Sequence, residues 1–87
     1  MKINEGFILR QIADKWVVLA VGQTSVSFHG MLALNESGVL LWNILERGGD
    51  RDALTEALLN EYEVTREEAS ADVDEFVNTL KEIGCIE

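Results

Sequence analysis

The sequence predicts one α+β domain in which a three-stranded antiparallel sheet is followed by three helices. The period of the apolar residues supports this order, because it changes near residue 35 from extended runs to the three-to-four spacing of amphipathic helices. The length of 87 residues allows one domain, which we expect to span residues 1–87, and an apolar content of 47% is enough for a packed core. The order of elements resembles a winged helix-turn-helix.

The extended runs lie in the first third of the chain. Residues 7–12 and 16–21 are rich in aliphatic residues and are joined by a short polar link, which is typical of a β-hairpin. Residues 22–25 have turn composition, and residues 26–34 form a third extended segment with Gly30 near its middle. We therefore expect a meander with the third strand at the edge of the sheet.

Each predicted helix has a recognisable start. Asn35 and Asp50 are suitable N-caps, and Thr65 with Glu68 matches a capping box. The first helix is expected to end at the glycine pair 48–49. The inward stripe of the last helix is expected to consist of Ala69, Val73, Phe76, Leu80 and Ile83, with Val77 at its margin.

The residue types needed for common catalytic and metal sites are scarce. The single histidine, His29, falls in the predicted third strand, and the single cysteine, Cys85, follows a glycine at a helix end. One of each cannot build a conventional Cys/His zinc site. His29 is expected to be structural, and Cys85 to be a small buried hydrophobe. Nucleotide-binding loops and a recognisable catalytic triad are absent, so we expect neither an enzyme nor a cofactor.

The net charge of −9 is carried by the second part of the chain. Up to residue 34 there are two acids and three basic residues, whereas the remainder has fourteen acids and four basic residues. Such a surface repels phosphates, so neither nucleic acid nor an anionic membrane is an expected partner. No apolar run is long enough to span a bilayer. The lone cysteine and the lack of a signal-peptide pattern predict a cytoplasmic location.

An open edge strand could bind a partner. Backbone N–H and C=O groups along residues 30–34 would recruit an extended peptide as an additional strand, and no charge or proline blocks that edge. The last helix would supply the second wall of a groove, with Val77 as the best candidate to line it. The pattern alone leaves an alternative equally open, in which this strand is internal or covered by a helix.

An ordered set of short runs resembles the PqqD family. The set begins with residues 31–45, which read MLALNESGVLLWNIL, and continues with residues 52–58, DALTEAL. It is completed by EYEV at 61–64, ADVDEFVNTL at 71–80 and GCI at 84–86. One departure is the loop after the first helix, Arg47-Gly48-Gly49-Asp50, where many members have Asp-Gly.

The resemblance implies a non-catalytic adaptor that holds the leader of a ribosomally made precursor peptide and presents it to a modifying enzyme. The implied enzyme is a radical S-adenosylmethionine protein with iron–sulfur clusters, and the product need not be the quinone of the family name. The residues implied to bind the peptide are Gly30, Met31, Leu32, Ala33, Leu34, Asp72, Val73, Phe76, Val77 and Leu80. Val77→Asp, or proline within residues 31–33, is expected to weaken micromolar binding.

Two other functions remain as alternatives. A winged-helix DNA-binding regulator would have a similar topology, but residues 66–83 carry six acids against two basic residues, the opposite of a recognition helix. A structural dimerisation domain would use the same edge strand to form a homodimer.

Overall fold

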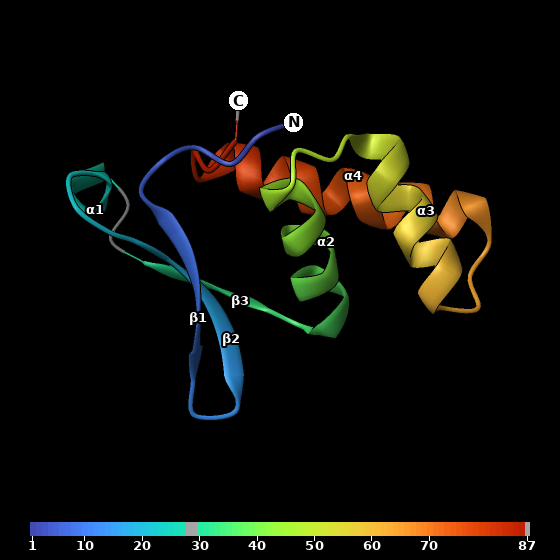
Figure 1. Ribbon diagram of the computed structural model, residues 1–87, viewed down its shortest axis with the longest axis horizontal. Coiled ribbons are helices and arrows are strands. Elements are labelled where there is room, and N and C mark those ends of the chain that lie inside the picture. Colours follow the sequence, from blue (N-terminus) through green and yellow to red (C-terminus); the bar gives the residue numbers. More distant parts are fainter. Residues whose placement is uncertain (28–29, 87) are drawn as a thin grey trace.

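The computed structural model describes residues 1–27 and 30–86. Its sheet has the order β1-β2-β3, with β1 at Phe7–Ile12, β2 at Lys15–Ala20 and β3 at Met31–Leu34. Both pairings are antiparallel. Figure 1 shows the sheet on one side of the molecule and the three longer helices on the other. The predicted α+β architecture and the predicted hairpin are confirmed.

The segment before β3 differs from its predicted structure. Residues 26–34 were expected to form one strand, but a four-residue helix, α1, occupies Thr24–Ser27, and the strand begins only at Met31. A local hydrogen bond favours the helical turn, because the hydroxyl of Ser25 donates to the carbonyl of Gly22 at 2.6 Å and so competes with a strand ladder. A second bond, from the hydroxyl of Thr24 to the carbonyl of Glu5 at 3.3 Å, connects the turn to the segment before β1. His29 lies outside the described residues.

Three longer helices follow the sheet: α2 at Glu36–Glu46, α3 at Arg51–Glu61 and α4 at Arg66–Glu82. The predicted caps are all confirmed. The side chains of Asn35, Asp50 and Thr65 accept hydrogen bonds from backbone N–H groups in the first turns of α2, α3 and α4. The Glu68 side chain completes the capping box by accepting from the Thr65 N–H at 3.0 Å.

One face of the sheet packs on the helices. The strand register places Phe7, Leu9, Val18, Leu32 and Leu34 on that face, and all five contact or belong to the hydrophobic core. The rest of the core comes from the helices and the C-terminal residues. Its other members are Leu41, Trp42, Leu45, Leu54, Leu58, Ala69, Val73, Val77, Leu80, Cys85 and Ile86.

The two ends of the chain lie side by side (Figure 1). Ile3 and Ile86 form an antiparallel bridge, and the Asn4 N–H donates to the Cys85 carbonyl at 2.7 Å. Asn4 also donates through its side-chain nitrogen to the Gly84 carbonyl at 2.9 Å. These bonds connect the end of α4 to the segment that enters β1. The position of α4 is therefore fixed by its core contacts and by the pairing of the residues after it with the N-terminal segment.

The capping box of α4 predicts a pH-dependent contribution to stability. The bonds between Thr65 and the Glu68 carboxylate lower the pKa of Glu68 from its ordinary value of 4.5. A carboxyl whose pKa falls on folding stabilises the folded state above its ordinary pKa, and this contribution is lost as the pH falls through the folded value. Glu68→Ala should therefore be less stable than the wild type at pH 7, by a difference that shrinks below pH 4.5. Urea denaturation at a series of pH values measures this difference.

Glu68→Gln is the matched control, because an amide oxygen still accepts the Thr65 N–H but does not titrate. The difference in stability between Glu68→Gln and Glu68→Ala should stay constant with pH. A wild-type advantage over Glu68→Ala that persists unchanged at pH 2–3 would contradict the assignment.

Candidate functional site

One edge of β3 is unpaired in the described part of the chain, where the strand pairs with β2 alone. The ladder shows which backbone groups face that edge. The Val21 N–H donates to the Gly6 carbonyl, so odd-numbered residues of β2 bond to β1 and even-numbered ones to β3. In β3, the partners of those even-numbered residues are Leu32 and Leu34. The N–H and C=O groups of Met31 and Ala33 therefore point to the open edge.

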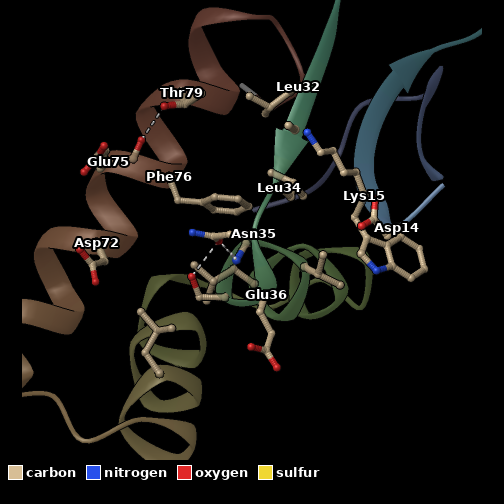
Figure 2. Close-up of a pocket in the computed structure, with 17 residues that line it drawn as sticks. Asp14, Lys15, Leu32, Leu34, Asn35, Glu36, Asp72, Glu75, Phe76 and Thr79 are labelled. Carbon is tan, nitrogen blue, oxygen red and sulfur yellow. Dashed lines mark hydrogen bonds between the residues drawn. The ribbon is translucent and has the colours of Figure 1, made fainter. Parts of the chain in front are cut away.

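An open cleft of about 940 Å³ lies beside this edge, between β3 and α4. Figure 2 shows the side chain of Phe76 extending from α4 towards Leu34, with Thr79 nearer to Leu32. The cleft reaches inward to buried residues of α2 and α3 and outward to the end of the β1-β2 hairpin. Its lining is Asp14, Lys15, Trp16, Leu32, Ala33, Leu34, Asn35, Glu36, Ser37, Gly38, Val39, Leu41, Leu58, Asp72, Glu75, Phe76 and Thr79.

The wall contributed by α4 follows from helix geometry. Asp72, Glu75, Phe76 and Thr79 are spaced i, i+3, i+4 and i+7, so they lie along one side of the helix. This side adjoins the buried face formed by Ala69, Val73, Val77 and Leu80. Phe76 lies nearest to that face and is partly buried, whereas Asp72 and Glu75 are exposed. The wall is therefore apolar towards the core and acidic towards solvent.

The N-terminus of α2 closes one end of the cleft. Asn35 Oδ1 accepts from the Gly38 N–H at 2.9 Å and from the Ser37 hydroxyl at 3.0 Å (Figure 2). A Cβ added at Gly38 would lie 3.2 Å from the Cβ of Leu34, which is closer than side chains normally approach. Glycine at this position therefore allows the helix to begin directly against the end of β3.

Half of the predicted binding residues line the cleft. Leu32, Ala33, Leu34, Asp72 and Phe76 do so, whereas Gly30 and Met31 are exposed beside it and not in its lining. The remaining three predicted residues are in the core, and none lines the cleft: Val73, Val77 and Leu80.

The expected position of Val77 is wrong. Its side chain is 0% exposed and packs in the core, while Phe76, which was assigned to the inward stripe, lies at the margin of that stripe and lines the cleft. Successive residues differ by about 100° around a helix axis, so a small rotation of α4 exchanges the two roles. The apolar pattern of the sequence does not determine that rotation.

The sequence-based prediction also missed several lining residues. Thr79 and Glu75 could have been found from the spacing of Asp72 and Phe76 along the same helix. Trp16 lines the cleft because it pairs with Leu34 across the ladder. That pairing joins residues far apart in the chain, and no local signal in the sequence identifies it.

Cys85, which the sequence analysis also considered, does not line the cleft. Burial raises the pKa of the Cys85 thiol to about 12, so the sulfur stays protonated at neutral pH and the expected buried role is confirmed. Among the described residues, no cluster of three His, Cys, Asp or Glu side chains could hold a metal ion. In that same part of the chain, no helix is long and apolar enough to cross a membrane.

The fold and the cleft define a small α+β recognition domain whose edge strand lies open beside a helix. A family model described as coenzyme PQQ synthesis protein D (PqqD) matches residues 15–86, and the chain belongs to that family. The resemblance predicted from its motifs is therefore confirmed. A search of curated proteins found no match.

Two solved structures are similar to this chain. One is described as TbiB1 in complex with the TbiA(beta) leader peptide, with 28% identity, a TM-score of 0.82 and coverage of 100% of this chain and 95% of that one. The other is lasso peptide synthetase B1 complexed with the leader peptide, with 26% identity, a TM-score of 0.75 and coverage of 93% and 89%.

The positions of Val77 and Phe76 predict that the same substitution destabilises the protein to different extents. Val77→Asp places a carboxylate in the core without a partner, which should lower the free energy of unfolding by about 3–5 kcal/mol. Phe76→Asp should cost much less, because the new carboxylate can reach water in the cleft. Urea denaturation followed by circular dichroism compares the two variants. If Val77→Asp were more stable than Phe76→Asp, the rotation of α4 about its axis would differ from the one in the structure.

Proposed function

We propose that this chain is a peptide-binding adaptor that captures the leader segment of a ribosomally synthesised precursor peptide and presents it to a modifying enzyme. The observation that carries the proposal is the open edge of β3 beside the cleft against α4. Strand addition uses such an edge, because the backbone groups of Met31 and Ala33 can pair with an extended peptide.

The two walls of the cleft would contribute differently to peptide binding. Main-chain bonds to β3 supply affinity that depends little on sequence, and alternate side chains of the added strand point towards the cleft and supply selectivity. Leu32, Leu34 and Phe76 offer an apolar surface to those side chains. Met31 and Ala33 belong to the site through their backbone, since their side chains are exposed on the opposite face of the sheet.

The similar solved structures support a leader peptide as the ligand, because both of those proteins are described as leader-peptide complexes. The sequence identity of 26–28% extends over nearly the whole of this chain. The family supports the same class of function, since the matched region includes β3 and α4.

The adaptor would not itself catalyse a reaction. Binding both the leader and an enzyme makes the second encounter intramolecular, which can raise overall avidity by about 10²–10⁴. A radical S-adenosylmethionine enzyme with iron–sulfur clusters is our proposed partner, and this proposal rests on the family resemblance. The lone buried cysteine supports a cytoplasmic setting.

DNA binding is a poorer explanation of the same fold. The exposed surface of α4 is acidic, and two of the basic residues of the helical part already form ion pairs, Arg51 with Asp74 and Arg66 with Glu56. A recognition helix needs free basic side chains to reach phosphates. A homodimer formed through β3 remains a competing occupant of the open edge, and peptide binding should then compete with self-association.

Ala33→Pro provides the sharpest test of strand addition. Proline removes an N–H that points to the open edge and leaves the Leu32 and Leu34 bonds to β2 intact. We expect a peptide that binds with a Kd of about 1 µM to bind the variant at least ten-fold more weakly. The probe is a fluorescently labelled peptide selected from a displayed library of random sequences, and titration by fluorescence anisotropy measures the change.

Ala33→Val is the matched control, because it keeps the N–H and suits a strand. It should bind within about two-fold of the wild type, and circular dichroism should show both variants folded. Equal affinity of a folded Ala33→Pro protein would refute strand addition. Sedimentation of the free protein tests the competing dimer, which the same proline would dissociate.

A further inference from the structure

The charges around the cleft are unbalanced. Four carboxylates line it, those of Asp14, Glu36, Asp72 and Glu75, against one cation, Lys15. All five side chains belong to exposed residues. Within residues 1–27 and 30–86, no ion pair involves any of the four carboxylates. An anionic surface thus surrounds an apolar cleft that we propose as a peptide site.

Other acids of the same helices have structural partners. Glu68 caps α4, Asp74 forms an ion pair with Arg51, and Glu56 with Arg66. Glu36 lies in the first turn of α2, where a negative charge is favourable beside the helix dipole. Asp72 lies inside α4, away from its first turn and without a partner of this kind, so helix stability does not account for it.

The carboxylates are distributed around the cleft. In Figure 2, Asp72 and Glu75 lie on α4 beside Phe76. In the same view, Glu36 lies below Asn35 at the end where β3 meets α2, and Asp14 lies next to Lys15. Charges at the mouth of a cleft with apolar walls act more strongly on a ligand than charges facing open solvent. A bound peptide that contacts Phe76 would therefore lie close to the carboxylates of Asp72 and Glu75 on the same helix.

We infer that the cleft selects leader segments that place a lysine or arginine beside the apolar side chain packed against Leu34 and Phe76. This inference rests on the proposed function and names the class of peptide that the site accepts. The basic side chain lies beside Phe76 along the wall formed by α4, where Asp72 and Glu75 supply the negative charge. Leaders with an acidic residue at that position are disfavoured by repulsion.

The test compares selection on three proteins with a displayed library of random peptides. The first is the wild type, and the second is Asp72→Lys/Glu75→Lys, which reverses two charges of the cleft. The third is Glu61→Lys/Glu82→Lys, which makes the same change in net charge outside the cleft, at helix ends where lysine is well tolerated. Circular dichroism establishes that each protein is folded.

We expect peptides selected on the wild type to be enriched in lysine and arginine next to an apolar residue. A selected peptide whose basic residue is changed to glutamate should bind the wild type and the control about five-fold or more weakly, as for a few exposed ion pairs. On the cleft variant this loss should disappear or reverse. Raising the salt concentration should weaken wild-type binding of the basic peptide.

Each other outcome has a definite meaning. Equal enrichment of acidic and basic peptides on the wild type, or an unchanged preference on the cleft variant, overturns the inference and leaves strand addition intact. Loss of the preference on the control variant as well shows that net charge alone attracts the peptides, and also overturns it. If no peptide is enriched on the wild type above Ala33→Pro, the proposed function itself fails.

Discussion

The burial of one face of α4 determines the arrangement of the whole site. Ala69, Val73, Val77 and Leu80 are buried against the rest of the core, and together they fix the rotation of the helix about its axis. Because an α-helix is rigid, with about 100° between successive residues, this rotation also fixes which side chains face β3. This rotation places Phe76 and Thr79 in the lining of the cleft, and no separate interaction is required to place them there.

The local features of the fold could be predicted from the sequence. The caps at Asn35, Asp50 and Thr65 depend on side chains bonding to backbone groups three residues away, so a short window of sequence contains the whole interaction. The same kind of local bond, from Ser25 to Gly22, was not anticipated. The first two residues of the predicted third strand, 26 and 27, belong to a helical turn instead.

The site was harder to predict because it depends on contacts between distant segments. The edge position of β3 was predicted and is confirmed, and the family resemblance placed the groove next to the last helix. The sequence did not distinguish Val77 from Phe76, since both are apolar neighbours and either fits a three-to-four spacing. Nor did it place Trp16 beside Leu34, because strand register is set by packing across the sheet.

An open strand edge carries a risk of pairing with the wrong partner, and the short length of β3 limits that risk. The strand has only four residues, and two of them direct their backbone groups towards β2. Few bonds are therefore available to an unselected strand. A tight complex must gain additional contacts from the cleft, which makes the side chains of the partner decisive.

The outer side of β3 stays exposed, and this affects any peptide bound at the open edge. Met31, with 62% of its surface exposed, and Ala33 lie on the face away from the helices. Side chains alternate across a strand, so every second residue of an added segment would stand on that same outer face. The domain would bind one set of the peptide's side chains in the cleft and leave the alternate set exposed to solvent. Another protein could therefore contact the exposed set while the peptide stays bound.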